Sequence, residues 1–338
     1  MLNKTIKKIS PLGFTWSTND PFIFCVHHAD DYPEGNEDFG PAASLEGRYI
    51  GSDFTLKDGW RMYHGDSVPG FPAHPHRGFE TVTIVLEGYV DHSDSMGASG
   101  RYGFGDVQWM TAGSGMQHCE MFPLVHRNKR NPLELFQLWL NLPREKKFAK
   151  PFYKMLWNEQ IPIVEQVNVA AKKTRVRVIA GNFAGEKAVP PPPDSWAANP
   201  ENHLAIWLIE IEDGGTLSLP QAKEGLERSL YFYSGAEVKI DGTQVKSYNS
   251  IGLESHLAVN VEATNGNVKL LLLQAKPINE PMVQQGPFVM NTHQEINEAI
   301  HDFRRTGFGG WPWPSADHTH GHLEWRFAKY ADGTEDLP

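Results

Sequence analysis

Two short segments of the chain place a histidine two positions from another metal-binding residue. The first is His74-Pro75-His76, and the second is His118-Cys119-Glu120. Successive side chains of a β-strand point to opposite faces of the sheet, so residues two apart point to the same face. If the two segments lie on neighbouring strands of a barrel, three imidazoles and one carboxylate meet inside it. This spacing predicts a metal site.

The donor set narrows the choice of metal. Three nitrogens and one oxygen suit a first-row transition metal better than magnesium or calcium, which prefer oxygen ligands. We expect one ion per chain, with iron(II) as the first choice and manganese, nickel, copper, cobalt or zinc as alternatives. Four ligands leave two positions of an octahedral metal open for substrate or dioxygen. A lone His-x-His pair is more often two surface or hydrogen-bonded histidines, but the second pair favours the metal.

The flanking sequence has the pattern of short strands. Residues 81–86 are rich in β-branched side chains and end at Glu87-Gly88, a turn signal. Gly113 and Gly115 stand just before the second histidine segment, where glycine permits the close backbone approach that a crowded metal centre needs. Residues 133–140 are almost continuously apolar, as in a strand buried on both faces. Short strands between frequent turns predict a sandwich or barrel.

A second series of candidate strands follows at residues 174–275, without a His-x-His or His-x-Glu pair, so we expect a metal-free barrel there. Thr292-His293-Gln294-Glu295 has the form of a capping box, and apolar residues follow it at helical spacing, which predicts one amphipathic helix packed on a barrel. The expected domains are residues 1–143 for the metal-binding barrel, 144–290 for the metal-free barrel, 291–309 for the helix and 310–338 for a tail.

Other histidines are not counted as ligands. His27 and His28 begin a polar stretch that we expect to be a loop with solvated side chains. His318, His320 and His322 alternate in the C-terminal tail, which is rich in Trp and Pro and is expected to be flexible or docked on the surface.

Composition excludes several classes of protein. The 338 residues suffice for two domains, and 31 basic against 41 acidic residues give a formal charge of −10, which argues against direct nucleic-acid binding. Cys25 and Cys119 alone cannot form a multi-disulfide framework and fit a reducing compartment. The chain has no apolar run of about 20 residues for a membrane span, and its first residues lack a secretory signal. We therefore expect a cytoplasmic monomer that binds neither membrane nor nucleic acid.

Four motifs resemble those of the pirin family of the cupin superfamily. They occupy residues 74–83, 105–113, 118–121 and 286–292, and the likeness runs from about Asp20 to Gly309. The resemblance implies an all-β bicupin, with two antiparallel β-barrels of the jelly-roll type and a metal, usually iron, in the N-terminal barrel only. The tail beyond about Gly310 lies outside the family pattern.

The resemblance places the family's metal ligands on His74, His76, His118 and Glu120, the same four residues that strand spacing selects. The family's usual serine between the last two ligands is Cys119 here. Because alternation turns Cys119 away from the metal, we expect ligation to be unaffected. Many cupins carry a glutamate ligand where Glu80 stands, but pirins use the position of Glu120 instead.

Two functions from different classes are implied by the resemblance. The first is a dioxygenase similar to quercetin 2,3-dioxygenase, which would take a flavonol such as quercetin and dioxygen, with Glu120 holding the metal and accepting the hydroxyl proton. The alternative is a regulatory metalloprotein that binds a protein partner according to the oxidation state of its iron, as pirins described as transcriptional co-regulators do. An enzyme needs an accessible apolar pocket at the metal, whereas a regulator needs a complementary surface patch.

Overall fold

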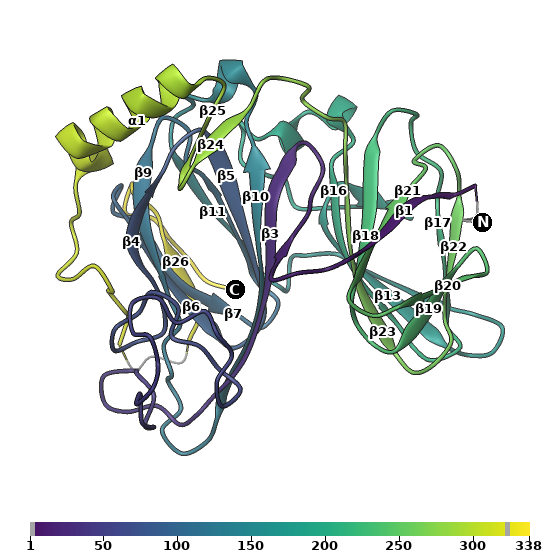
Figure 1. The fold of residues 1–338 in the computed structure, drawn as a ribbon, viewed down its shortest axis with the longest axis horizontal. Coiled ribbons are helices and arrows are strands. Elements are labelled where there is room, and N and C mark those ends of the chain that lie inside the picture. Colours follow the sequence, from purple (N-terminus) through teal and green to yellow (C-terminus); the bar gives the residue numbers. More distant parts are fainter. Residues whose placement is uncertain (1–3, 322–324) are drawn as a thin grey trace. The chain divides into compact units, whose positions relative to one another are not determined.

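The computed structural model describes residues 4–321 and 325–338. Its regular structure is almost entirely antiparallel β-sheet, and α1 (His293–Thr306) is the one α-helix of the described residues, so the predicted all-β fold with a C-terminal helix is confirmed (Figure 1). The chain forms two units. We call Val26–Asn158 with Glu280–Pro338 the N-terminal barrel unit, and the chain up to Cys25 with Glu159–Asn279 the C-terminal barrel unit. Within the described residues, no helix has the length and apolar character needed to cross a membrane.

Two six-stranded sheets build the N-terminal barrel unit. The first has the strand order β11-β8-β5-β10-β3-β2, with β2 (Thr15–Trp16), β3 (Phe22–Tyr32), β5 (Phe79–Glu87), β8 (Val107–Thr111), β10 (Asn131–Asn141) and β11 (Phe152–Leu156). Of these strands, β2 and the residues of β3 up to Cys25 are counted with the C-terminal barrel unit. The second has the order β27-β26-β7-β6-β9-β4, with β4 (Gly70–His76), β6 (Tyr89–Asp94), β7 (Ser99–Gly103), β9 (Met116–Met121), β26 (Phe327–Lys329) and β27 (Glu335–Asp336). Strands β5, β8 and β9 are buried almost throughout, so the polar side chains that they carry, such as His118 and Glu120, lie inside the unit.

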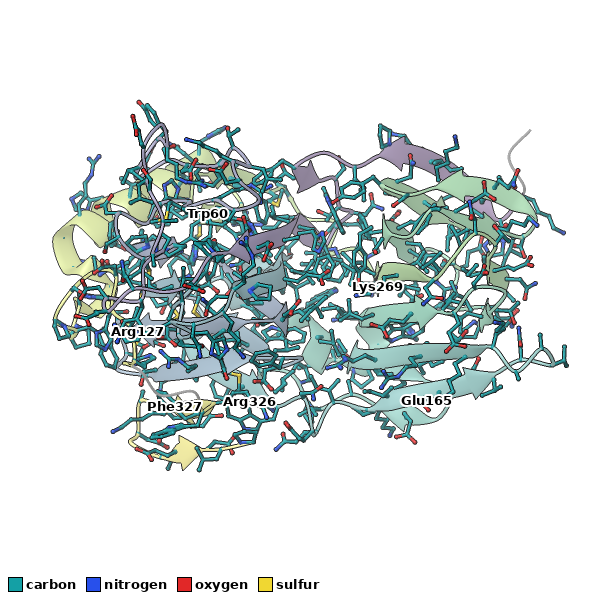
Figure 2. All side chains as sticks on the ribbon, turned by 90° about the horizontal axis from the view of Figure 1, so that it is seen from below. Trp60, Arg127, Glu165, Lys269, Arg326 and Phe327 are labelled. Carbon is teal, nitrogen blue, oxygen red and sulfur yellow. The ribbon has the colours of Figure 1, made fainter. Side chains whose placement is uncertain are left out.

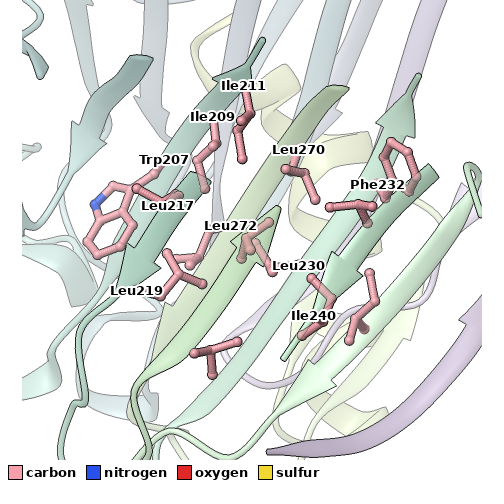
Figure 3. Close-up of a cluster of buried hydrophobic side chains, with 14 of the residues drawn as sticks. Trp207, Ile209, Ile211, Leu217, Leu219, Leu230, Phe232, Ile240, Leu270 and Leu272 are labelled. Atoms are coloured by element: carbon pink, nitrogen blue, oxygen red, sulfur yellow. The ribbon is translucent and has the colours of Figure 1, made fainter. Parts of the chain in front are cut away.

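The C-terminal barrel unit also contains two large sheets. The seven-stranded sheet has the order β1-β21-β18-β23-β16-β13-β12, with β1 (Ile6–Pro11), β12 (Ile163–Val167), β13 (Lys173–Ala180), β16 (Ala205–Ile211), β18 (Glu227–Ser234), β21 (Asn249–Leu253) and β23 (Val268–Ala275). The four-stranded sheet has the order β17-β22-β19-β20, with β17 (Thr216–Leu219), β19 (Glu237–Ile240), β20 (Thr243–Lys246) and β22 (Val259–Ala263). Apolar side chains from both sheets fill the space between them, among them Leu230 and Leu272 of the seven-stranded sheet and Leu217 and Ile240 of the four-stranded sheet (Figure 3).

The two units differ from the contiguous domains expected from the sequence. Strand β1 pairs with β21, so the N-terminal residues extend a sheet of the C-terminal barrel unit. Strand β11, which lies in the expected connection, pairs with β8, and the residues from Glu280 onward belong to the N-terminal barrel unit. Sequence patterns predict that a strand exists but do not say which sheet edge it joins, because every edge offers the same backbone donors and acceptors.

A cap formed by residues 280–309 closes one end of the N-terminal barrel unit. It consists of the hairpin β24 (Val283–Gln285) and β25 (Phe288–Met290), helix α1, and the 3-10 turn η4 (Gly307–Gly309). The Thr292 hydroxyl accepts a hydrogen bond from the Glu295 amide, as the capping-box pattern predicts, and Ile296 and Ala299 pack on Phe288 and Met290. Three further 3-10 turns are η1 (Arg144–Lys146), η2 (Trp196–Ala198) and η3 (Pro200–Asn202).

The C-terminal tail is part of the N-terminal barrel unit. Strand β26, which carries Phe327, pairs with β7, and β27 pairs with β26 (Figure 2). Arg326 forms an ion pair with Asp106 at 2.7 Å. The tail therefore extends a sheet, where the sequence suggested only a flexible or surface-docked segment.

The expectation of solvated histidines at 27 and 28 is wrong. Both lie on β3, which continues to Tyr32 instead of ending before them. The His28 ring is buried, and its Nδ1 lies 2.7 Å from the Tyr63 hydroxyl. Alternation along β3 places His28 and Asp30 on the same face, and the Tyr63 hydroxyl donates a hydrogen bond to Asp30 there. The polar residues of this stretch therefore belong to a buried hydrogen-bond network.

Candidate metal centre

Two antiparallel strands bring the predicted histidines together. In the register of β4 and β9, His74 lies opposite His118, and His76 lies opposite Met116. A register shift between Phe71 and His74 interrupts the pairing just before the first histidine. The Nε2 atoms of His76 and His118 are 3.0 Å apart, and one nitrogen from each of His74, His76 and His118 lies within 4.8 Å of the other two.

These distances fit a single metal ion. Nitrogens 3.0 Å apart subtend about 90° at an ion that is about 2.1 Å from each, which is the angle between adjacent positions of an octahedron. The Nδ1 atom of His118 is buried and has no hydrogen-bond partner among the described residues. Two buried nitrogens that face each other cannot both be acceptors without an ion or a proton between them. The residues therefore suit a bound cation.

Burial keeps the three imidazoles in the form that binds metal. Burial lowers the pKa of His74 to about 4, and together with the neighbouring histidines it lowers the pKa of His76 and His118 well below the usual value. Neutral imidazole is the ligand form, because a protonated ring has no lone pair to offer. The His74 Nδ1 lies 2.8 Å from the Pro72 carbonyl oxygen, which selects Nε2 as the free nitrogen of that ring.

Glu120 lies beside His118, but it is not part of the group of three whose ligand atoms all lie within 4.8 Å of one another. Its Oε2 atom is 3.8 Å from His118 Nε2. The Thr83 hydroxyl donates to Glu120 Oε1 at 2.8 Å, and the Gln137 amide donates to Oε2 at 2.9 Å. Burial raises the pKa of Glu120, and the hydrogen bonds from Thr83 and Gln137 oppose that rise. Each carboxylate oxygen has two lone pairs, so both can accept these bonds and still face a cation.

Thr83 and Gln137 are site residues that the sequence reasoning missed. Thr83 lies in a β-branched run where threonine is ordinary, which hides its role. Gln137 carried a usable signal, because an amide inside the apolar run of β10 needs a buried partner.

His92 was missed as well. It is buried on β6 opposite Glu120, and its ring nitrogens face Asp94 at 3.2 Å and Gln108 at 2.8 Å.

The remaining candidates lie elsewhere. The Cys119 thiol faces the carbonyl oxygen of His318 at 3.7 Å and packs with Met121, on the face of β9 opposite Glu120, as alternation predicts. Glu80 is buried on β5 and accepts a hydrogen bond from Thr111 at 2.6 Å. It is three residues from Thr83 and therefore points to the opposite face of that strand.

The tail histidines also point away from the centre. The backbone amide of His320 donates to Asp91, and its ring nitrogen lies 2.8 Å from the His92 carbonyl oxygen. The His318 ring stacks on Trp313. His322 lies outside the described residues.

Aromatic rings surround the histidines. The ring centroids of Phe79 and Trp139 lie 5.0 Å and 5.4 Å from that of His76, and the Phe71 centroid lies 6.4 Å from that of His74. Apolar rings lower the local dielectric and strengthen the interaction of a carboxylate with a cation.

Comparison with known families places both halves of the chain. A family model described as Pirin matches residues 17–140, and a model described as Pirin C-terminal cupin domain matches residues 206–309. The three histidines and Glu120 all fall in the first match. The tail from residue 310 lies outside both.

Similar proteins include one from Pseudomonas aeruginosa named "Putative quercetin 2,3-dioxygenase", which is 38% identical over 247 residues, 71% of this chain and 79% of that protein. A Rattus norvegicus protein named Pirin is 37% identical over 261 residues, 73% of this chain and 81% of its own. Among solved structures, quercetin 2,3-dioxygenase from Acinetobacter baumannii has a TM-score of 0.69 and 28% identity, and covers 90% of this chain and 98% of its own.

Proposed function

The chain belongs to the pirin family of bicupin proteins, and from this premise we propose that it is an iron-dependent dioxygenase that cleaves a flavonol such as quercetin. The observation that supports the proposal most directly is the cluster of three imidazoles, with the Glu120 carboxylate 3.8 Å from the His118 ring. The similarity to proteins named quercetin 2,3-dioxygenase supports the substrate class. We place the activity in the cytoplasm of the cell, in a monomeric protein whose two thiols, Cys25 and Cys119, are unpaired.

His74, His76, His118 and Glu120 would hold the metal. When bound, iron(II) supplies the redox chemistry that cleavage by dioxygen needs and polarises the substrate oxygens. The three neutral histidines contribute no charge, so Glu120 alone would offset part of the cation's charge. Thr83 and Gln137 fix the plane of that carboxylate through one hydrogen bond to each oxygen.

Glu120 would also accept a proton from the substrate. A flavonol hydroxyl group must lose its proton before the ring becomes electron-rich enough to react with dioxygen. Burial raises the pKa of Glu120, which makes its carboxylate a stronger base than an exposed one. Phe79 and Trp139 would exclude water from the same space and keep the deprotonated substrate from being reprotonated by solvent.

Anaerobic loading with iron(II), followed by oxygen-consumption assays with quercetin and other enolic aromatic compounds, tests the proposal. Elemental analysis of the loaded protein should show about one iron per chain, and His76→Ala should lose it. Glu120→Gln should keep part of the metal through its amide oxygen while losing most turnover, because an amide does not accept a proton at neutral pH. Glu80→Gln is the matched control, since Glu80 is equally buried but bonds to Thr111 on the opposite strand face.

The regulatory alternative makes the opposite prediction. Under this alternative, iron-loaded wild-type protein consumes no oxygen with any of these compounds and binds a protein partner in only one oxidation state of its iron. That result would replace the enzyme hypothesis with the regulatory one.

A further inference from the structure

The C-terminal barrel unit contains a cavity of about 660 Å³ at the end of its barrel where β16 and β18 begin and where β13, β17 and β23 end. The long connection between β13 and β16 covers it. That connection carries the hairpin β14 (Asn182–Phe183) and β15 (Glu186–Lys187), a run of four prolines, and two 3-10 turns. Cavities of this volume accommodate small organic molecules.

Arg228 is the buried charged residue among those that line this site. It is 2% exposed and lies at the start of β18, opposite Gln274 of β23. Its Nε donates to Gln274 Oε1 at 2.7 Å, and its Nη1 donates to the Pro220 carbonyl oxygen at 2.9 Å. Gln274 is itself held by a hydrogen bond from its amide to the His203 carbonyl oxygen. Two fixed bonds orient the guanidinium and leave Nη2 with no hydrogen bond to any described residue.

The charge of Arg228 is not neutralised within the part of the chain that the structure describes. It forms no ion pair there, and no aspartate or glutamate is among the described residues that line the cavity. The charged or titratable side chains that do line it are Lys187, Lys223 and His203. Burial lowers the pKa of Arg228 to about 10, which leaves the guanidinium charged at neutral pH. A buried cation without a counter-ion is costly, so an anion that enters this cavity gains both a charge partner and hydrogen bonds.

A second unsatisfied donor lines the same cavity. Trp207 on β16 is 3% exposed, and its indole Nε1 has no hydrogen-bond partner among the described residues. Figure 3 shows its ring at the margin of the apolar cluster, with the nitrogen facing away from the labelled aliphatic side chains. Other parts of the wall are apolar, including Leu204, Val189 and Pro191. The cavity thus combines a guanidinium with apolar wall residues that suit a hydrocarbon ring.

We propose that this cavity binds a small organic monocarboxylate with an apolar or aromatic body, whose carboxylate is held by Arg228. A guanidinium presents two parallel N–H groups that match the two oxygens of a carboxylate. The Nη1 and Nη2 atoms of Arg228 keep such a pair available, because Nη1 uses only one of its hydrogens for Pro220. The apolar part of the wall, which includes Leu204, Val189 and Pro191, favours an organic acid over a bare inorganic anion. The site is separate from the proposed metal centre and does not depend on it.

Equilibrium dialysis of the full-length, iron-loaded protein with labelled benzoate tests this site. Wild-type protein should bind one benzoate per chain, and benzamide should compete at least about tenfold more weakly, because it lacks the charge that pairs with Arg228. Arg228→Met should weaken benzoate binding by about 10- to 100-fold. Arg175→Met is the matched control, since Arg175 lies on β13 of the same unit but pairs with Glu165 at the surface, and it should bind benzoate like wild type.

Two further variants keep the test decisive if Arg228→Met fails to fold. Ala188→Trp should block the cavity and abolish binding while leaving Arg228 in place. His76→Ala should leave benzoate binding unchanged, which separates this cavity from the metal centre. No saturable benzoate binding to folded wild-type protein would overturn the proposal, and so would equal binding of benzamide. Inorganic phosphate that competes as strongly as benzoate would overturn the assignment to an organic carboxylate.

Discussion

Lys147 offers a quantitative test of how the cap is held on the N-terminal barrel unit. Its side chain is 1% exposed, and its ammonium group donates to three oxygens: Gly78 O at 2.8 Å, Asn141 Oδ1 at 2.6 Å and Val289 O at 3.0 Å. These oxygens belong to the entry of β5, the end of β10 and the cap strand β25. In Lys147→Met the side chain has a similar length, but the buried acceptors lose the amine that donates to them. We expect a loss of about 2 to 4 kcal/mol in the free energy of unfolding at pH 9.

The same residue predicts a pH dependence with a definite sign. Burial lowers the pKa of Lys147 to about 7, from an ordinary value of 10.5. Between pH 7 and pH 9 the unfolded chain therefore holds more protons at this residue than the folded chain, so stability rises with pH. Integrating that difference gives about 2 kcal/mol of added stability for wild type from pH 7 to pH 9. The stability difference between wild type and Lys147→Met should therefore be about 2 kcal/mol larger at pH 9 than at pH 7.

Urea titrations of both proteins at the two pH values measure this difference, and subtraction cancels the other titrating groups. Lys150→Met, which removes an exposed lysine three residues away, is the control and should follow wild type at both pH values. The three acceptor oxygens oppose the effect of burial on the pKa of Lys147. They match the three protons of the ammonium group, whereas a neutral amine has only two protons and leaves one of the oxygens without a donor. A stability difference that stays constant between pH 7 and pH 9 would show that these oxygens outweigh burial, and would refute the reasoning.

Three other outcomes are expected. Cys119→Ser should keep about one metal per chain by elemental analysis, because the thiol faces His318 on the other side of β9; loss of metal from a folded variant would contradict that orientation. Gln137→Leu should weaken metal affinity by about 10- to 100-fold in a competition titration, since it frees one oxygen of Glu120, whereas Gln166→Leu on β12 of the other unit should not. Removing residues 311–338 should make Cys119, which packs beside Trp311, react with a thiol reagent, while Cys25 stays unreactive; equal protection of Cys119 in the shortened chain would show that the tail does not cover it.

Strand alternation accounts for what could be predicted of the candidate site. His74, His76, His118 and Glu120 lie on two strands, and the two-residue period alone orients them to one face while turning Cys119 to the other. The period does not say which strands are neighbours. The pairing of β4 with β9 spans more than forty residues and depends on the whole barrel, so the convergence itself was a hypothesis until the register was known.

The parts that could not be predicted are contacts between segments distant in the sequence. Thr83 and Gln137 approach Glu120 from two strands of the opposite sheet, and neither carries a local motif. The tail has little alternation, yet three residues of it add a strand to β7, because an exposed sheet edge pairs with almost any extended backbone. Strand β1, near the start of the chain, belongs to the C-terminal barrel unit, whereas the cap, near its end, belongs to the N-terminal barrel unit. For the same reason, local sequence does not reveal which unit either segment joins.

The two barrels differ in where their strands carry polar side chains. In the N-terminal barrel unit several polar residues of the proposed metal centre stand within strands, as His118 does on β9 and Thr83 does on β5, while His76 is the last residue of β4. In the C-terminal barrel unit the inner positions of β18 and β23 are apolar, with Leu230 and Leu272 directly opposite each other, and no metal-binding group of histidines forms among the described residues there. Its buried polar groups stand instead near strand ends, Arg228 at the start of β18 and Gln274 near the end of β23. Polar positions at the strand ends instead of within the strands therefore distinguish the proposed anion site of the C-terminal barrel unit from the proposed metal centre of the N-terminal one.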